Sequence, residues 1–411
     1  MAEHTTSLAL NAGSVGLAPA QRQALAHIWA VLPHARLVGG VVRDLLAGRS
    51  VADVDIATPE PPEHVQAALE AAGIKVVPTG LAHGTVTAVI ESAPYEITTL
   101  RQDTETDGRH AVVSWTQDWQ QDAARRDFTI NAMSRDKEGV LFDYFGGQAD
   151  LQAGHVRFVG QAAQRIEEDA LRILRFFRFQ GRYGHGQPDV QAVTAIEKRT
   201  DLLKKLSVER VWSELQRLLV GPQAAQQVLL MARLGVLAAV FAQGVKVEHF
   251  AALVAVGAPP EPVLRLAGLI DGGAEACARN LKLSRVEESL LKALLTPVGL
   301  QPELSDAELS CLLSDNALPV LLGQSWLAQA TALQVCPARR AESAQAFTQL
   351  RQRLVTLPVP VFPVAGKDLL AAGVPPGPQM GQILARLRLW WQQNGCTPTQ
   401  DACLAQVPFL H

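Results

Sequence analysis

Two glycines and two aspartates stand close together near the N-terminus, in LVGGVVRDLLAGRSVADVDIAT, residues 37–58. A strand-like run leads into Gly39 and Gly40, where a helix is expected to begin. Glycines let a backbone approach a phosphate, and the free amides of a helix start attract anions. Asp53 and Asp55 follow at the expected start of the next strand, where residues two apart share one face. The pattern predicts that both aspartates hold a pair of Mg²⁺ ions for phosphoryl transfer.

Two further side chains belong to this prediction. Arg43 comes one turn after the glycines, so it is expected to bind a triphosphate oxygen. Glu96, in the strand-like run PYEITTL, is the candidate for a third carboxylate from a neighbouring strand, although an ordinary exposed glutamate has the same pattern. The alternative for the whole segment is a glycine turn followed by two surface aspartates. The GGxxRD pattern upstream of the aspartates favours the metal site.

A second polar cluster is RRDFTINAM, Arg125–Met133. Arg126 is expected to contact the triphosphate. Asp127 is expected to orient an arginine or to accept a hydrogen bond from a ribose hydroxyl, and Asn131 could serve the same nucleotide. The alternative is a polar helix start in front of a strand.

The third cluster is EEDALRILRFFRF, residues 167–179, in which Asp169, Arg172, Arg175 and Arg178 recur every three residues along a predicted helix. An aspartate and an arginine one turn apart present an acceptor beside donors, which matches the base edges of cytosine and adenine. Guanine and uracil would place a carbonyl oxygen against the carboxylate. The spacing therefore predicts nucleotide binding and base selection, and a helix with surface ion pairs is the alternative.

The elements that must position these residues change character along the chain. Over residues 35–160, short strand-like runs alternate with short helical pieces, which predicts a small α+β domain with a mixed sheet. A helix is expected before it, over Pro19–Leu32, and a mobile loop within it, over residues 101–113. From Ala162 onwards helical periodicity dominates, so the second half is predicted to be a string of helices.

Composition limits the class of protein. The chain has 411 residues and a formal net charge of −3, so any nucleic-acid site must be a local basic patch. Its five cysteines have no zinc-like spacing, which predicts a reduced, cytoplasmic protein. The N-terminus has no basic stretch typical of a signal peptide, and no run of eighteen apolar residues occurs.

Together these segments resemble the class II CCA-adding enzymes and the related bacterial poly(A) polymerases, within the polymerase-β-type nucleotidyltransferases. The stretch FDYFGGQADL, residues 142–151, is also similar, with Tyr144 where proline is usual, and Gln161 stands where aspartate is common. The residues that match the family's motifs are Gly39, Gly40, Arg43, Asp44, Asp53, Asp55, Arg125–Ala132, Glu168, Asp169, Arg172, Arg175 and Arg178.

The resemblance implies an α+β nucleotidyltransferase head followed by an all-helical neck, body and tail. It also implies Mg²⁺ as cofactor, CTP and ATP as substrates used without a template, and tRNA as the partner gripped by body and tail. The expected domains are a helical lead (1–34), a catalytic head (35–154), a neck with the base-selecting helix (155–220) and a body and tail (221–411).

Three alternatives to CCA addition stay open. The chain could be a poly(A) polymerase, a partial enzyme that adds only CC or only A, or a catalytically inactive RNA-binding module on the same fold. The near-neutral charge and the loop sequence DGRHAVV favour the CCA-adding enzyme over the poly(A) polymerase. The presence of both Asp53 and Asp55 argues against an inactive module.

Overall fold

The computed structural model describes residues 5–6, 16–81, 84–106 and 111–409. The chain divides into two compact units. Unit 1 comprises residues 1–223 and 229–240, and unit 2 comprises residues 224–228 and 241–411. The finer division into lead, head, neck and body remains a prediction.

A mixed sheet forms the N-terminal part of unit 1. Within the described residues it has eight strands in the order β1-β10-β9-β2-β3-β6-β5-β4, and only β3 and β6 pair in parallel. The strands are β1 Thr5–Thr6, β2 Arg36–Val38, β3 Asp55–Thr58, β4 Lys75–Gly80, β5 Thr85–Ile90, β6 Ala93–Thr99, β9 Met133–Arg135 and β10 Leu141–Asp143.

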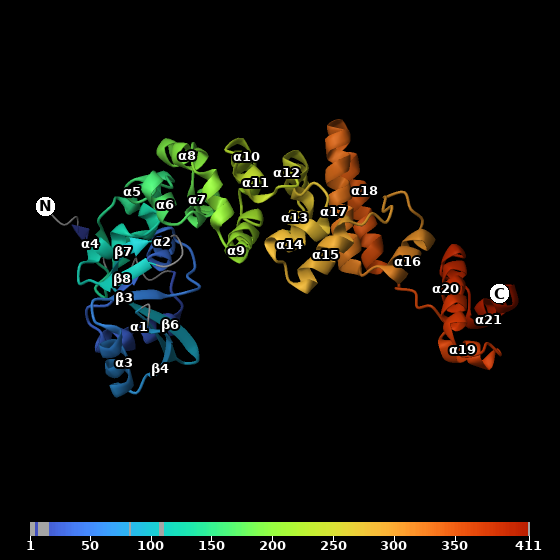
Figure 1. Ribbon diagram of the computed structural model, residues 1–411, viewed down its shortest axis with the longest axis horizontal. Helices are drawn as coiled ribbons and strands as arrows, with labels where there is room; N and C mark the ends of the chain where they lie inside the picture. The colour runs from blue at the N-terminus through green and yellow to red at the C-terminus, as the bar shows by residue number, and fades with distance from the viewer. Residues whose placement is uncertain (1–4, 7–15, 82–83, 107–110, 410–411) are drawn as a thin grey trace. The chain divides into compact units, whose positions relative to one another are not determined.

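Short helices lie between and after these strands. They are α1 Pro19–Val31, α2 Gly40–Leu46, α3 Pro62–Ala71, α4 Trp119–Ala124, the 3₁₀ turn η2 Thr129–Asn131 and α5 Gly147–Ala153. Figure 1 shows them among the blue and blue-green strands at the N-terminal end of the chain. Proline at the first helical position of α1 and α3 has a backbone angle already suited to a helix start.

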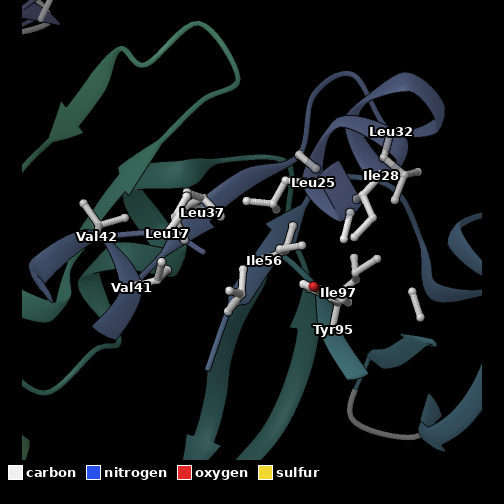
Figure 2. Close-up of a cluster of buried hydrophobic side chains, with 14 of the residues drawn as sticks. Leu17, Leu25, Ile28, Leu32, Leu37, Val41, Val42, Ile56, Tyr95 and Ile97 are labelled. Carbon is white, nitrogen blue, oxygen red and sulfur yellow. The ribbon is translucent and has the colours of Figure 1, made fainter. Parts of the chain in front are cut away.

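The apolar side chains of the N-terminal helix pack into the core of the sheet domain. Leu25 and Ile28 on α1, and Leu32 directly after it, recur at helical spacing and are buried against the sheet residues Ile56 and Ile97 (Figure 2). The predicted N-terminal helix therefore belongs to the core of the sheet domain. The apolar face of this helix covers one side of the sheet. The polar residues at the strand ends are not part of that core.

One expectation for this domain was wrong. The segment predicted to be a mobile loop contains two paired strands, β7 Arg101–Thr106 and β8 Ala111–Trp115, which form a separate antiparallel hairpin. Residues 107–110 lie outside the described part. Only the buried Leu100 separates the end of β6 from the start of the hairpin, so the hairpin is anchored directly to the sheet.

The rest of unit 1 is helical, as predicted. Its elements are α6 Ala162–Glu168, α7 Leu171–Tyr183, α8 Val190–Glu197, η3 Thr200–Lys205, α9 Val208–Leu219 and α11 Val236–Val240, while α10 Ala224–Arg233 carries the unit boundary. Phe176 and Phe177 on α7 are fully buried. The ring of Phe128, next to η2, lies 6.4 Å from the ring of Phe176, so aromatic packing holds α7 against the sheet domain.

Unit 2 is helical throughout its described residues. Its elements are α12 Val247–Ala255, α13 Pro262–Leu269, α14 Ala274–Leu281, α15 Arg285–Leu295, α16 Asp306–Asp315, α17 Leu318–Val335, η4 Pro337–Arg339, α18 Arg340–Thr356, α19 Gly366–Ala371, α20 Pro378–Gln393, α21 Gln400–Leu404 and η5 Val407–Phe409. The α+β class with a mixed sheet followed by helices is thus confirmed. Among the described residues, no helix is both long and apolar enough to cross a membrane.

Candidate active site

Three carboxylates line the edge where β3 and β6 run in parallel. Asp55 is the first residue of β3, and its register partner on β6 is Glu96. Asp53 lies in the bend before β3, so the expectation that both aspartates occupy the strand was wrong. The strand begins only at Asp55 because pairing with β6 begins there. All three side chains are exposed and line one hollow of about 390 Å³.

The charge at this edge is uncompensated. Partial burial raises the pKa of Asp55 above its ordinary value, and the nearby carboxylate of Glu96 raises it further. Arg126 and Arg43 act in the opposite direction but do not cancel the shift, to which Asp53 also contributes. A cation bound at this edge would relieve the repulsion.

The glycine turn sits beside this edge. Gly39 has φ +68°, in the region that favours glycine, and its amide donates to Met133 O at 3.2 Å. A Cβ on Gly39 would stand 2.7 Å from Nη1 of Arg126. Gly40 then begins α2. A larger residue at position 39 would therefore displace Arg126 as well as strain the backbone.

Arg43 is buried on α2, where it contacts two other side chains. Its Nη1 donates to Oδ1 of Asn131 at 2.5 Å, and its Nη2 pairs with Asp44 at 3.0 Å. Asp44 also accepts from the hydroxyl of Tyr183 on α7. These contacts fix the Arg43 side chain, and its predicted contact with a triphosphate remains a prediction.

Arg125 and Arg126 share a buried partner that sequence reasoning missed. Asp122 on α4 pairs with Arg125 at 2.9 Å and with Arg126 at 3.1 Å. Burial alone would raise the pKa of Asp122, but the two arginines outweigh burial and lower it. Asp122 stands three residues before Arg125 and four before Arg126, a helical spacing that could have predicted both ion pairs.

Asp127 links the sheet domain to α7. It is buried and accepts from the side-chain amide of Asn131 at 2.9 Å and from Nε of Arg175 at 2.8 Å. Burial alone would raise its pKa, but Arg175 and the hydrogen bonds lower it below its ordinary value. One of the two roles predicted for Asp127, holding an arginine, corresponds to this contact. The predicted ribose contact remains a prediction.

Asp169 and Arg172 do not pair with each other. Asp169 lies between α6 and α7, where its Oδ2 accepts from Arg210 on α9 at 2.7 Å. Arg172 pairs with Glu168 at 2.7 Å and donates to the carbonyl oxygen of Arg125 at 3.0 Å. A simple ion pair between Asp169 and Arg172 on a helix surface is therefore excluded. Arg210 was not identified from sequence, because it is 41 residues away.

The remaining predicted residue, Arg178, pairs with the buried Glu214 of α9 at 2.6 Å. Glu214 also lies 3.5 Å from Arg175. Arg175 is among the described residues that line the cleft between α2, η2 and α7, whereas Arg178 is not. Arg178 is therefore placed to support Arg175 through Glu214, not to contact a ligand in the cleft directly.

This cleft of about 450 Å³ collects most of the predicted residues, and its size suits a nucleotide. Arginines outnumber carboxylates on its walls, which favours a polyanionic ligand. The lining residues are Gly39, Gly40, Arg43, Asp55, Arg125, Arg126, Asp127, Asn131, Asp169, Leu171, Arg172, Arg175, Phe179 and Arg210. Segments more than 100 residues apart thus contribute to one wall.

The carboxylates beside the cleft suit Mg²⁺ better than a metal held in a closed cage. Within the described residues, no three His, Cys, Asp or Glu side chains converge tightly enough to enclose a metal by themselves. Mg²⁺ does not need such a cage, because it commonly uses one or two carboxylates together with water and substrate phosphates. Asp53 and Asp55, exposed beside an arginine-rich cleft, fit that mode of binding.

Two segments of the chain match known protein families. Residues 35–157 match the Poly A polymerase head domain, and residues 188–245 match the probable RNA and SrmB-binding site of polymerase A. The CCA tRNA nucleotidyltransferase 1, mitochondrial, of Mus musculus is 37% identical over 385 residues, which is 90% of this chain and 86% of the mouse protein. A CCA-adding enzyme of Geobacillus thermodenitrificans is 41% identical over 49% of each chain.

A solved structure agrees with these similarities. The crystal structure of the Bacillus stearothermophilus CCA-adding enzyme in complex with CTP matches with a TM-score of 0.73 and 28% identity, over 95% of this chain and 98% of that chain. Fold and site together define a nucleotidyltransferase. The chain belongs to the class II CCA-adding enzyme and poly(A) polymerase family, as a CCA tRNA nucleotidyltransferase. Since the mouse relative is named mitochondrial, the cytoplasmic location remains a prediction.

Proposed function

We propose that this protein adds or repairs the 3′-terminal CCA of tRNA, with CTP and ATP as substrates and no nucleic-acid template. The observation that carries the proposal is the single cleft shared by Gly39, Asp55, Asp169 and Arg172. A triphosphate turn, a metal-binding carboxylate and a pair of base-edge groups are the three parts that template-free nucleotide addition requires. The names of the relatives support tRNA as the acceptor.

For the chemical step, we assign Asp53 and Asp55 as the ligands of Mg²⁺. When bound, Mg²⁺ would lower the barrier by neutralising the triphosphate and favouring the deprotonated hydroxyl of the acceptor. Glu96 is assigned as the third carboxylate, since it stands beside Asp55 on the neighbouring strand. The open sides of these exposed carboxylates leave room for substrate oxygens.

The triphosphate is proposed to lie along the glycine turn. Gly39 and Gly40 present backbone without a side chain, which permits close approach of phosphate oxygens. Arg126 projects toward Gly39, and Arg43 lines the same cleft, so both place positive charge at the turn. Asp127 acts indirectly by fixing Arg175 in the wall.

Base selection is proposed for Asp169 and Arg172. The carboxylate of Asp169 can accept from the amino group of cytosine or adenine, and Arg172 can donate to the adjacent ring nitrogen. Their present partners, Arg210 and Glu168, hold each side chain at the cleft and restrict its rotation. Arg175 belongs to the same wall, and Arg178 supports it from behind through their shared partner Glu214.

A poly(A) polymerase is the second candidate, because the matching head domain is shared with that class. Products distinguish the two. With tRNA ending at the discriminator base, CTP and ATP, we expect addition of CCA followed by a stop, read by sequencing the products. A long A-tail would assign a poly(A) polymerase, and arrest after CC, or addition of only A, would assign a partial enzyme.

The same assay tests the assigned carboxylates. Asp53→Ala and Asp55→Ala should each lose incorporation of both CMP and AMP by at least about 1000-fold, because losing a metal ligand costs several kcal/mol of barrier. Binding of tRNA should change little. Asp118→Ala, which removes an exposed carboxylate that caps α4, serves as the matched control. Retention of more than about a tenth of the rate in either variant would reject that residue as a ligand.

A further inference from the structure

Two cysteine side chains of unit 2 are in direct contact. The sulfur atoms of Cys311 and Cys396 lie 2.9 Å apart, and the Cys396 thiol donates to Cys311. Cys311 is on α16 and Cys396 follows α20, 85 positions further along the chain. Because the sulfur atoms of a disulfide are about 2.05 Å apart, joining these two requires an approach of less than about 1 Å.

The surroundings hold both cysteines in place. Arg388 on α20 pairs with Asp315 of α16 at 2.8 Å and donates to the carbonyl of Ser314 at 3.0 Å. The amide of Cys396 donates to Trp391 O at 3.0 Å, which fixes the turn after α20. The two thiols are therefore already ordered, and closing a bond between them costs little further entropy.

Access differs between the two sulfur atoms. Cys311 is half-buried, whereas Cys396 is 8% exposed. Cys311 also packs against the apolar core formed by residues 364–407, to which Cys396 itself belongs. A small oxidant from solvent would thus meet Cys311 first, and Cys396 would act second.

We propose that Cys311 and Cys396 form a reversible modification site, an intramolecular disulfide that joins α16 covalently to the C-terminal core. In the first step, the Cys311 thiolate attacks a small disulfide oxidant such as oxidised glutathione, and one glutathione thiolate leaves. The Cys396 thiolate then attacks the Cys311 sulfur and releases the second glutathione. Two protein thiols are oxidised and one glutathione disulfide is reduced, and the two cysteine protons pass through solvent to the two departing glutathione thiolates.

The protonation of Cys396 governs how fast the second step proceeds. Burial raises the pKa of the Cys396 thiol above its ordinary value, and in the reduced protein the hydrogen bond with Cys311 raises it further. Since the thiolate is the nucleophile, closure is slow at neutral pH and accelerates as the pH rises. A reaction limited by an exposed, ordinary thiol would level off at lower pH.

The test uses the full-length folded protein with reduced and oxidised glutathione, followed by alkylation and peptide mass spectrometry without reduction. We expect a cross-linked peptide pair containing Cys311 and Cys396, lighter by two hydrogen atoms than the two thiol peptides. Closing an 85-residue loop should raise the thermal midpoint of unit 2 by about 5 °C or more, and dithiothreitol should reverse the shift.

Variants separate this site from general thiol oxidation. Cys311→Ser and Cys396→Ser should each remove the cross-link and the thermal shift. Cys336→Ser, which removes an exposed cysteine, should retain both. If Cys396→Ser fails to fold, the half-buried Cys311→Ser still decides. Stable glutathione adducts on Cys311 without the cross-link, or a cross-link formed only after unfolding in urea, would overturn the proposal.

Discussion

Asp169 lies between α6 and α7 and lines the cleft together with Arg210 of α9. One of its oxygens accepts from the backbone amide of Leu171 at 3.1 Å, and the other pairs with Arg210 at 2.7 Å. These two contacts fix the carboxylate without enclosing it, since its side chain remains 26% exposed. An ordered carboxylate that still faces the cleft suits the reading of a base edge.

At the residue scale, Asp169→Ala tests base selection. The change removes an acceptor for the amino group of cytosine or adenine and a repulsion against the carbonyl of uracil or guanine. We expect kcat/KM for CTP and ATP to fall, and discrimination against UTP and GTP to weaken by about 1–3 kcal/mol. Arg172→Ala should lower kcat/KM for CTP and ATP, with a smaller relative increase in the use of UTP and GTP.

The control for this measurement is Glu167→Ala. Glu167 lies two residues from Asp169 and pairs with Arg199 at 2.7 Å, but its side chain is exposed and does not line the cleft. Glu167→Ala should leave the ratios of kcat/KM among the four nucleotides unchanged. Unaltered ratios in Asp169→Ala itself would remove Asp169 from base selection.

At the element scale, α7 is the helix that joins the sheet domain to the following helices. Its aromatic side packs against Phe128, and its arginine side pairs with Asp127 and Glu214. Burial lowers the pKa of Arg178, although Glu214 raises it in part. The position of the arginines in the cleft therefore depends on carboxylates supplied by other elements.

Glu214→Ala tests this dependence. Removing Glu214 leaves the charge of Arg178 without its carboxylate partner, while Arg175 keeps Asp127, so unit 1 should lose about 3 kcal/mol of unfolding free energy. Glu214→Gln keeps a hydrogen-bond acceptor and should lose less. Thermal and chemical unfolding curves give the measurement. Asp201→Ala, in an exposed pair with Lys204, should change little, and an equally small effect at Glu214 would contradict the argument.

At the scale of the whole molecule, the two units differ in how they use buried charge. In unit 1, Asp122 and Asp127 are buried and have pKa values below the ordinary value of 3.8, because their arginine partners outweigh the effect of burial. In the described part of unit 2, the carboxylates with lowered pKa values are Glu275 and Glu308, which are fully exposed. Only the buried pairs are expected to affect stability strongly.

This difference predicts the order of acid unfolding. A carboxyl group with a lowered folded pKa stabilises the protein above its unfolded pKa, and this contribution disappears as the pH falls through the folded value. As the pH falls from about 4 to about 2, unit 1 should therefore open before unit 2. Pepsin digestion at stepped pH, with fragments mapped by mass spectrometry, reads the order. Asp122→Asn should weaken the pH dependence of unit 1, and earlier cleavage in unit 2 would contradict the prediction.

The sequence by itself determined that an α+β part is followed by helices, and it identified several of the chemical groups. The apolar spacing on α1 and the pattern from Gly39 to Asp55 depend on neighbours within a few turns of chain, so they are visible without a structure. The glycine turn and the strand edge were predicted for this reason. The paired strands of residues 101–115 were missed, because the polar first strand, RQDTET, is equally typical of a loop.

Only the tertiary structure decided which charged side chains pair with each other. Asp169 pairs with Arg210 across 41 residues, and Arg178 pairs with Glu214 across 36. Neither spacing has a periodicity that a sequence can reveal, because such contacts depend on where α9 returns against α7. Electrostatic interactions fall off with distance through space rather than along the chain. The identities of the charged residues could be read from the sequence, but the packing of the helices determines which charges neutralise each other and which face the cleft.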